Sequence, residues 1–303
     1  MSAIELDGLG KQFGSVTALH EVDMTVDEGE IFGFLGPNGA GKSTTIDILL
    51  DFVRPTSGSA RVLGMDAQAQ SKAIRQRVGV LPDGFDVYDR LTGRQHVEFV
   101  VESKGADDDP DAVLERVGIP DAADRKAGGY SKGMAQRLVL GMALVGEPDL
   151  LILDEPSTGL DPNGAREMRE IIREERDRGA TVFFSSHILG QVEAVCDRVG
   201  ILRAGELVAV DSVEGLRDAR GDGARLLVTV DDPAAAADVL RDLPGVGSVT
   251  AEGDTVKVGV ADGSKTSVLR ALEDAGVDVR DFETEETSLE ELFVSYTTEE
   301  GVA

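Results

Sequence analysis

The sequence predicts an α/β fold in which helices cover both faces of a mostly parallel sheet, followed by a small α+β domain. Residues 150–153 and 181–184 are short, continuous apolar runs, as expected of central strands buried on both faces. A charged segment of helical character, residues 165–178, connects them. Residues 31–35 form a third apolar run, and helical spacing follows over residues 44–52. Strands that alternate with helices in this order are typical of a parallel sheet.

Two further parts complete the first domain, which we expect to span residues 1–216. Residues 1–30 alternate apolar and polar side chains, which predicts an antiparallel hairpin or meander that turns at residues 27–29. Residues 85–145 form an expected helical subdomain, with helices over residues 93–103, 110–117 and 131–145.

The second domain is expected over residues 224–303, after a polar, glycine-rich linker at residues 217–223. A last helix over residues 288–296 begins with a capping-box pattern, because Ser288 is followed by Glu291 three residues later. The order β-α-β-β-α-β is that of a ferredoxin-like fold. Its expected elements are a strand at 225–230, a helix at 234–243, a hairpin with its tip at 252–254, a helix at 265–275, a strand at 277–282 and the last helix.

The charge balance is strongly acidic. Asp and Glu number 57 against 30 basic residues, the net charge is −27, there is no Trp, and aromatic residues make up 4%. One interpretation is an ordinary acidic cytosolic protein. The other, which we favour, is a halophilic protein in molar salt, where repulsion between carboxylates is screened within about 3 Å. In dilute salt such a charge opposes binding to nucleic acid, whereas in molar salt this argument weakens because both attraction and repulsion are screened. We expect no nucleic-acid partner.

The sequence shows no membrane-spanning or secretory segment. No stretch approaches the roughly 20 apolar residues that cross a bilayer. Residues 1–10 lack the basic start and apolar run of a signal peptide. The single cysteine, Cys196, excludes an intrachain disulfide and fits a reducing cytosol. We expect a cytoplasmic chain that reaches a membrane only through another polypeptide.

A phosphate-binding motif, G-x-x-x-x-G-K-[ST], lies between a predicted strand and a predicted helix, as this motif requires. Glycines let the backbone fold around phosphate, so that its N–H groups point inward at the start of a helix. Lys42 would reach the outer phosphates, and the Ser43 hydroxyl would ligate Mg²⁺. The motif predicts nucleotide binding by Gly36, Pro37, Asn38, Gly39, Ala40, Gly41, Lys42, Ser43 and Thr44.

Two acidic residues follow the apolar run at 150–153. A strand that ends in Asp154 places this carboxylate at the sheet edge beside the phosphate loop, where it can hold Mg²⁺. Glu155 follows directly and can polarise an attacking water molecule as a general base. The alternative is that the two residues are solvated acids without a function. The presence of the phosphate loop makes this alternative the weaker interpretation.

Three more segments, read with these two motifs, carry a family resemblance. They are Tyr-Ser-Lys-Gly-Met-Ala-Gln-Arg-Leu at residues 130–138, Ser-Thr-Gly-Leu-Asp at 157–161 and Ser-Ser-His at 185–187. In this order the set resembles the ATP-binding cassette (ABC) ATPases over roughly residues 4–215. The resemblance implies a P-loop NTPase cassette with a RecA-like core, an antiparallel β subdomain and a helical subdomain.

The resemblance also implies roles for further residues. Two cassettes pair head to tail, and the signature motif of one closes over ATP held by the other. His187 would contact the γ-phosphate as the switch histidine, Asp161 would communicate across the dimer, and Phe13 would stack against adenine, a core phenylalanine being the alternative. The signature motif comprises Ser131, Lys132, Gly133 and Met134.

The sequence departs from the usual family pattern in the signature motif and in the lid loop. The signature usually reads Leu-Ser-Gly-Gly-Gln, whereas Lys132 replaces a glycine here and Met134 replaces the glutamine. Asp83 stands where the family has the glutamine of the lid loop, which senses magnesium and touches the transport partner. An aspartate can still ligate Mg²⁺, but it is shorter and charged, so the coupling role of this position is in question.

Details of these motifs resemble one branch of the family. The Leu-Pro-acid lid loop, the signature and residues 287–293 resemble ATPases of exporters whose permease is a separate chain. Within this branch, residues 81–138 are similar to the copper-processing ATPase that supports maturation of nitrous oxide reductase. Sister exporters of drugs or lipids share much of this pattern.

We therefore predict an ATP-binding and ATP-hydrolysing subunit of an exporter, a homodimer or paired cassette on the cytoplasmic face of a separate membrane permease. The alternative is a soluble ABC ATPase that acts on ribosomes or DNA. It is disfavoured by the single motif set and by the short segment between Ser43 and Ser131, which leaves room only for a compact helical subdomain. A regulator that does not hydrolyse ATP is disfavoured because Glu155 is present.

Overall fold

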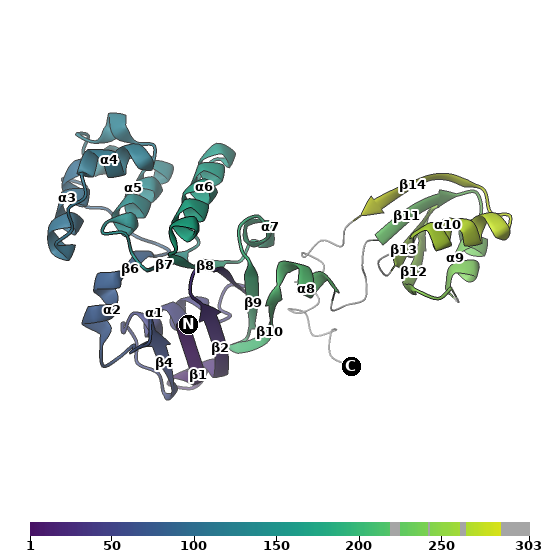
Figure 1. Cartoon of the computed structure of the whole chain (residues 1–303), viewed down its shortest axis with the longest axis horizontal. Coiled ribbons are helices and arrows are strands. Elements are labelled where there is room, and N and C mark those ends of the chain that lie inside the picture. The colour runs from purple at the N-terminus through teal and green to yellow at the C-terminus, as the bar shows by residue number, and fades with distance from the viewer. Residues whose placement is uncertain (219–224, 242, 261–264, 286–303) are drawn as a thin grey trace. The chain divides into compact units, whose positions relative to one another are not determined.

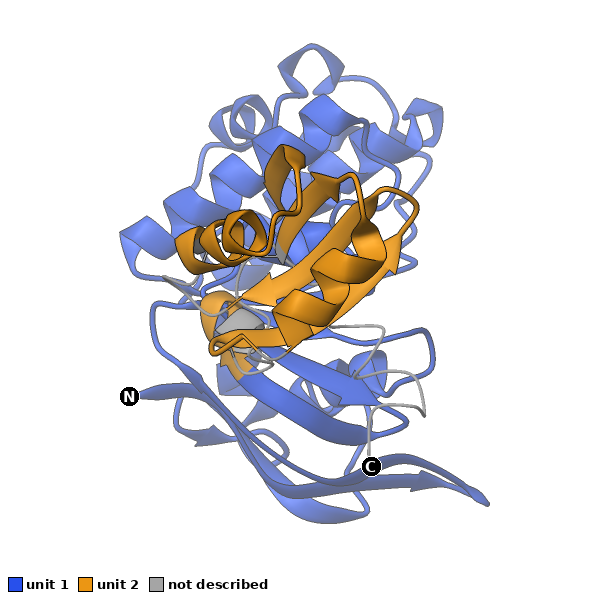
Figure 2. Ribbon diagram, turned by 90° about the vertical axis from the view of Figure 1, so that its right-hand side faces the viewer, with its two compact units in different colours: residues 1–210 blue, residues 211–303 orange. Residues whose placement is uncertain are grey.

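The computed structural model describes residues 1–218, 225–241, 243–260 and 265–285 and divides the chain into two compact units (Figure 1). These are Met1–Val210 and Asp211–Ala303, coloured separately in Figure 2. The division precedes helix α8 (Val213–Asp218), whereas composition places the end of the first domain at residue 216. No helix among the described residues is long and apolar enough to cross a bilayer.

The first unit is built on a six-stranded sheet in the order β10-β9-β3-β8-β7-β6. The pairs β9–β3, β3–β8, β8–β7 and β7–β6 are all parallel. All residues of β3, β7 and β8 are buried, which is why these strands read as continuous apolar runs. The strands are β3 (Ile31–Leu35), β6 (Val78–Leu81), β7 (Leu150–Asp154), β8 (Thr181–Ser186), β9 (Arg198–Arg203) and β10 (Glu206–Ser212).

An antiparallel sheet in the order β2-β1-β4-β5 completes the β structure of this unit. Its strands are β1 (Ser2–Phe13), β2 (Val16–Asp27), β4 (Ser57–Val62) and β5 (Met65–Asp66). The β1–β2 hairpin turns at Gly14 and Ser15, whereas the expected turn at residues 27–29 instead leads from β2 into β3. Gly14 has a φ of 59°, which glycine adopts readily.

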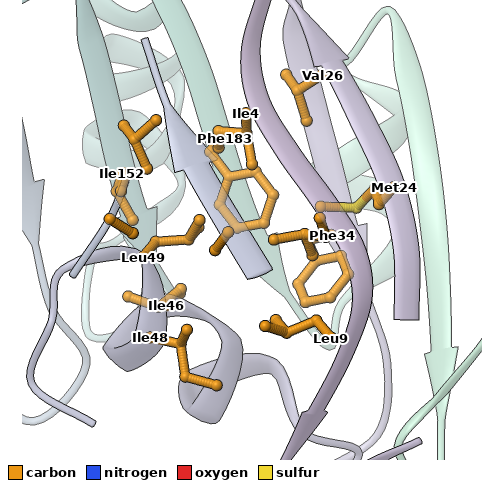
Figure 3. Close-up of a cluster of buried hydrophobic side chains, with 14 of the residues drawn as sticks. Ile4, Leu9, Met24, Val26, Phe34, Ile46, Ile48, Leu49, Ile152 and Phe183 are labelled. Atoms are coloured by element: carbon orange, nitrogen blue, oxygen red, sulfur yellow. The ribbon is translucent and has the colours of Figure 1, made fainter. Parts of the chain in front are cut away.

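One apolar core joins the two sheets to helix α1 (Lys42–Leu49), as Figure 3 shows. Phe34 on β3 and Phe183 on β8 pack with ring centroids 5.2 Å apart. Side chains from the antiparallel sheet and from α1 surround them, including Ile4, Leu9, Met24, Ile46 and Leu49. The start of α1, which carries the phosphate loop, is therefore fixed to both sheets.

The helical subdomain comprises α3 (Gly93–Lys104), α4 (Pro110–Arg116) and α5 (Lys132–Leu144), with short 3₁₀ turns at Pro120–Ala122 and Ala127–Gly129. The three helices pack on one another, and α5 also packs on β6. Each begins with a capping side chain, namely Thr92, Asp109 and Ser131. These caps explain why sequence alone places the starts of the three helices within a residue of the observed positions.

His96, which matches no functional motif, is a buried structural residue of this subdomain. It is 2% exposed, and its Nε2 accepts a hydrogen bond of 3.0 Å from the backbone N–H of Tyr88. Its Nδ1 must then carry the proton, which it donates to the carbonyl oxygen of Thr92 at 2.7 Å. The ring therefore joins the segment before α3 to the helix.

The remaining helices of the first unit are α2 (Ser71–Arg77), α6 (Pro162–Arg178) and α7 (Leu189–Glu193). Asp161 caps α6, because its Oδ1 accepts a 2.7 Å hydrogen bond from the Gly164 N–H. Gly179 ends α6 in the left-handed conformation, with a φ of 105°. The helix follows β7 and precedes β8, as the parallel crossover requires.

The second unit has the predicted ferredoxin-like order β11-α9-β12-β13-α10-β14. Its elements are β11 (Arg225–Val230), α9 (Pro233–Arg241), β12 (Val246–Glu252), β13 (Thr255–Val260), α10 (Lys265–Asp274) and β14 (Val279–Glu285). The sheet order is β12-β13-β11-β14, with antiparallel pairs throughout. Both helices contribute to its core, for example through Leu240 and Leu272. The expected helix at 288–296 lies outside the described residues.

Candidate functional site

The phosphate loop connects β3 to α1, and its path depends on glycine at two positions. Gly41 has a φ of 113°, and a Cβ there would lie 2.7 Å from the carbonyl oxygen of Ala18. A Cβ on Gly36 would lie 2.5 Å from the carbonyl oxygen of Leu202. The loop backbone therefore approaches β2 and β9 more closely than any other residue type allows.

Lys42 is the first residue of α1 and lies over its own loop. Its side chain is nearly buried, and Nζ donates hydrogen bonds to the carbonyl oxygens of Gly36 at 2.6 Å and Pro37 at 3.4 Å. Burial lowers the pKa of Lys42, and this shift is opposed by three nearby carboxylates, those of Glu155, Asp154 and Asp83. The ammonium group thus lies between the loop carbonyls and an acidic cluster.

Asp154 ends β7 and meets the first turn of α1. Ser43 Oγ donates a 3.2 Å hydrogen bond to Asp154 Oδ2. Asp154 is 5% exposed, and burial raises its pKa, while the hydroxyls of Ser185 and Ser43 lower it in part. On β8, Ser185 is the register partner of Asp154, and its buried hydroxyl is the second such group beside this carboxylate. A buried carboxylate with two hydroxyls around it is an oxygen-rich set that suits a hard divalent cation.

Glu155 follows β7, and its carboxylate is held by the residues that end β8. His187 Nδ1 lies 2.7 Å from Glu155 Oε1, and Ser186 Oγ donates a longer hydrogen bond of 3.4 Å to Oε2. Glu155 is 8% exposed and has a φ of 49°, a left-handed conformation that non-glycine residues rarely adopt. This arrangement fixes Oε1 and leaves Oε2, among the described residues, with one weak partner.

These groups line one cavity of about 320 Å³. It is bounded by the phosphate loop, the end of β7, the residue after β8 and the lid segment after β6. The residues that line it are Ala18, Asn38, Gly39, Gly41, Lys42, Ser43, Thr44, Asp83, Asp154, Glu155, Thr158 and His187. The structure therefore brings together the phosphate loop, the acidic pair, the lid-loop acid and the histidine expected from sequence.

Phe13 does not line this cavity. It ends β1 with 48% of its surface exposed, so it is not a core residue. The ammonium of Lys11 lies 4.6 Å from the centre of its ring. The exposed ring of Phe13 therefore has a cation over one of its faces.

The signature residues lie at the start of α5, away from the cavity that holds the phosphate loop. Ser131 caps the helix, because its Oγ accepts a 3.2 Å hydrogen bond from the Met134 N–H. The Met134 sulfur lies 2.9 Å from a guanidinium nitrogen of Arg125. Lys132 lines a neighbouring cavity of about 240 Å³ together with Asp83. Within a single chain, these residues do not complete the nucleotide site.

Sequence reasoning assigned no role to several residues that contact the site. Ser185 and Ser186 belong to a motif identified in the sequence. Their position at the end of a buried strand could have indicated that they lie beside Asp154. Gln136 donates a 2.8 Å hydrogen bond to the carbonyl oxygen of Pro156. The sequence signal for this contact was that Gln136 is an uncharged polar residue on the apolar side of a helix.

The fold and the site together define an ATP-binding cassette, the nucleotide-binding module of the ABC class. A family model described as "ABC transporter" matches residues 19–158. A second, described as "ATP-binding protein DrrA1-3-like, C-terminal domain", matches residues 205–297.

Known proteins resemble the chain over nearly its whole length. The daunorubicin resistance ATP-binding protein DrrA3 of Streptomyces coeruleorubidus is 33% identical, over 98% of this chain and 96% of the relative. The linearmycin resistance ATP-binding protein LnrL of Bacillus subtilis (strain 168) is 31% identical, over 97% and 98%. A solved ATP-binding subunit of an ABC transporter is 28% identical, with a TM-score of 0.68, over 73% of this chain and 94% of that one.

The chain belongs to the family of DrrA-like ABC transporter ATP-binding proteins. It is an ATP-binding, ATP-hydrolysing subunit of an ABC transporter.

Proposed function

We propose that this subunit powers export of a small toxic compound through a separate membrane permease. The permease would hold the subunit at the cytoplasmic face of the membrane. Relatives of this chain are named for resistance to daunorubicin and linearmycin, and another, from Bacillus licheniformis, for bacitracin transport. The copper-processing alternative rests on residues 81–138 alone, whereas the resistance proteins match nearly the whole chain. We therefore favour the resistance class of cargo.

The observation that carries the proposed ATP site is the single cavity shared by the phosphate loop, Asp154, Glu155 and His187. Backbone N–H groups of the loop and the start of α1 would bind the phosphates. Lys42 would exchange its hydrogen bonds to two loop carbonyls for contacts to the outer phosphates. This exchange explains why a lysine is held so deep in the loop without a salt-bridge partner at its Nζ among the ion pairs of the described residues.

Ser43 and Asp154 would hold Mg²⁺, with Asp83 as an additional acid at the lid. The fit rests on the buried Asp154 carboxylate, on its contact to Ser43 and on the Ser185 hydroxyl beside it. The cation would neutralise charge on the phosphates and on this acidic cluster. The other residues of the site would act on water and on the γ-phosphate.

Glu155 would accept the proton of the attacking water. His187 fixes Oε1 through its 2.7 Å contact, so Oε2 is the oxygen that would take the proton. His187 is 43% exposed at its side chain and borders the same cavity, so its second ring nitrogen would reach the γ-phosphate. Orientation by a fixed neighbour is what a general base requires.

Head-to-tail pairing of two chains would complete each site. Ser131, Gly133 and Met134 lie at the start of the 13-residue helix α5, whose N–H groups favour an anion. Because they lie away from the chain's own phosphate loop, the ATP that they would contact belongs to a second copy. Asp161, after the Glu155 segment, would take part in the contact between copies, and Phe13 would stack on adenine.

We also propose that residues 1–216 act as the cassette and residues 224–303 as an accessory domain. The separate family model for residues 205–297 supports an independent role for the second part. The acidic composition, with a net charge of −27, supports function in molar salt.

Measurements of hydrolysis and of nucleotide binding test the ATP site. Glu155→Gln is expected to bind Mg-ATP with wild-type affinity, to abolish turnover and to trap an ATP-bound dimer detectable by light scattering. Lys42→Ala is expected to weaken ATP binding itself. A Glu155→Gln protein with the wild-type rate of hydrolysis would refute the assignment of the base.

Affinity purification of the tagged chain from host membranes, solubilised in molar salt, tests the partner. Recovery of a stoichiometric polytopic membrane protein would support the exporter. Recovery only from the soluble fraction, with ribosomal or DNA-associated proteins, would favour the non-transport alternative.

A further inference from the structure

The backbone that carries Glu155 is strained, and the strain has two sources. Its φ of 49° lies in the left-handed region, which non-glycine residues rarely adopt. The next residue is Pro156, and a residue before proline is normally confined to extended conformations. The surrounding structure must therefore hold this segment in place, because the isolated chain would not adopt it.

Three hydrogen bonds from the described residues hold the backbone of Glu155 and Pro156. The Glu155 N–H donates to the carbonyl oxygen of Ser185 at 3.0 Å, and the Thr158 N–H donates to the carbonyl oxygen of Glu155 at 3.1 Å. The third is the hydrogen bond of 2.8 Å from Gln136 Nε2 to the carbonyl oxygen of Pro156. The first two join the segment to β8 and to its own turn, whereas the third joins it to α5.

The hydrogen bond from Gln136 is well shielded. Gln136 is 3% exposed, and it is the only buried uncharged polar side chain that α5 carries among its described residues. A buried amide that loses its partner is costly, so this contact specifies one placement of the two elements. Gln136 belongs to the same helix whose first turn contains Ser131 and Gly133.

The first turn of α5 also packs along the same segment. The aliphatic part of Lys132 lies against Gly159, where a Cβ would be 2.6 Å from the Lys132 Cδ. Gly159 has a φ of 84° and no side chain, which leaves room for this contact. A Cβ on Gly133 would lie 3.4 Å from the Gly159 carbonyl oxygen. The start of α5 and residues 156–159 thus pack as one body.

We propose that Gln136 is a positioning residue for ATP hydrolysis, which links the placement of the general base to the helix that would contact the partner chain's ATP. The inference rests on the proposed roles of Glu155 and of the signature residues. A displacement of α5 moves the Pro156 carbonyl oxygen, and with it the backbone of Glu155 one residue away. Binding of the second chain's nucleotide at the start of α5 is thereby coupled to this chain's own base.

The test replaces the amide with an apolar group of similar length. Gln136→Met keeps the volume and removes the donor, and Gln136→Glu, which keeps the shape, is made in parallel in case the first variant folds poorly. Gln68→Met is the matched control, because Gln68 Nε2 donates a 3.0 Å hydrogen bond to the carbonyl oxygen of Ile48, away from the cavity. All variants are made in the full chain, and Glu155→Gln is measured beside them.

The expected result separates turnover from binding. Gln136→Met is expected to lower kcat roughly 10- to 100-fold, as small misplacements of a catalytic group do. Its affinity for ATP and its KM are expected to stay within about twofold, although its Tm falls more than that of Gln68→Met because Gln136 is buried. Gln68→Met is expected to hydrolyse ATP at the wild-type rate.

Three outcomes would overturn this inference. In the first, Gln136→Met and Gln136→Glu keep the wild-type kcat while Glu155→Gln is inactive, so the base is right and the positioning role is wrong. In the second, both Gln136 variants lose ATP binding along with turnover, so the contact is structural only. In the third, Glu155→Gln retains full activity, so the failure lies in the proposed function itself.

Discussion

The buried carboxylate of Asp154 is expected to destabilise the protein when nucleotide is absent. Its side chain is nearly buried, its pKa is raised by burial, and the carboxylates of Asp83 and Glu155 add repulsion. A raised pKa in the folded state means that folding binds a proton. The contribution of Asp154 to stability is therefore highest at low pH and falls as the pH rises from the ordinary value of 3.8 through the folded pKa.

Asp154→Asn removes this charge without changing the shape of the side chain. The Asn Oδ1 still accepts the hydrogen bond that Ser43 donates at 3.2 Å, whereas the attraction between the carboxylate and Lys42 is lost. Relief of a buried charge is expected to stabilise the nucleotide-free protein by about 1 kcal/mol, within the range of single stabilising substitutions. For a unit of this size, that is a rise in Tm of roughly 2–4 °C.

Bound Mg-nucleotide is expected to reverse the order of stability. A ligand at 100 times its Kd stabilises the folded state by about 2.7 kcal/mol, and a variant that binds a hundredfold more weakly loses most of this gain. Wild type with a Mg-bound non-hydrolysable ATP analogue should therefore melt above Asp154→Asn, although it melts below it without ligand.

Differential scanning calorimetry measures both conditions, since the chain has no Trp to report unfolding by fluorescence. Asp177→Asn, an exposed acid on α6, is the control and should change the stability by less than about 0.5 kcal/mol. The reasoning is refuted if Asp154→Asn is less stable than wild type without ligand, or if the nucleotide analogue raises the Tm of both proteins equally.

Two further predictions concern the start of α5 and the charge of the chain. Ser131→Ala removes an N-cap and should cost about 1 kcal/mol, while Ser131→Asn keeps a capping side chain and should restore the Tm. If the hydroxyl also contacts the partner's ATP, the rate of hydrolysis stays low in both variants. Recovery of hydrolysis in Ser131→Asn would mean that Ser131 only caps the helix. The Tm of the wild-type protein should rise between about 0.1 M and 1 M salt, because the screening length falls from about 10 Å to about 3 Å. A Tm that calorimetry finds independent of salt would argue for an ordinary acidic protein.

The parts of the fold that follow from local pattern were predictable. The continuous apolar runs of β7 and β8 identify buried parallel strands, and Ser131 identifies the start of α5 because a capping residue acts locally. The predicted position of the hairpin turn was wrong because both residues 14–15 and residues 27–29 carry turn signals. Alternation of apolar residues gives the face of a strand but does not say which turn closes a hairpin.

The candidate site was predictable in its chemistry but not in its geometry. The phosphate-loop motif and the Asp154-Glu155 pair name the residues, because their chemistry requires those types at those spacings. The contact of Gln136 with Pro156 joins elements 20 residues apart and depends on the packing of α5. No local rule contains such a contact. The left-handed backbone of Glu155 is likewise set by neighbours from β8 rather than by its own preference, which as a residue before proline is for extended backbone.

The strain at Glu155 and the incompleteness of the single chain point to the same control of hydrolysis. If the base were fully placed in one chain, that chain would hydrolyse ATP before the second chain arrives. The energy of hydrolysis would then not drive the permease. Here the base is held partly by His187 at the end of β8 and partly, through Pro156, by the helix that begins with the signature residues. A strained segment held from both sides responds to displacement of either support. With the roles proposed above for Glu155, His187 and the signature residues, proton transfer would wait until both the γ-phosphate at His187 and the partner's nucleotide at α5 are in place.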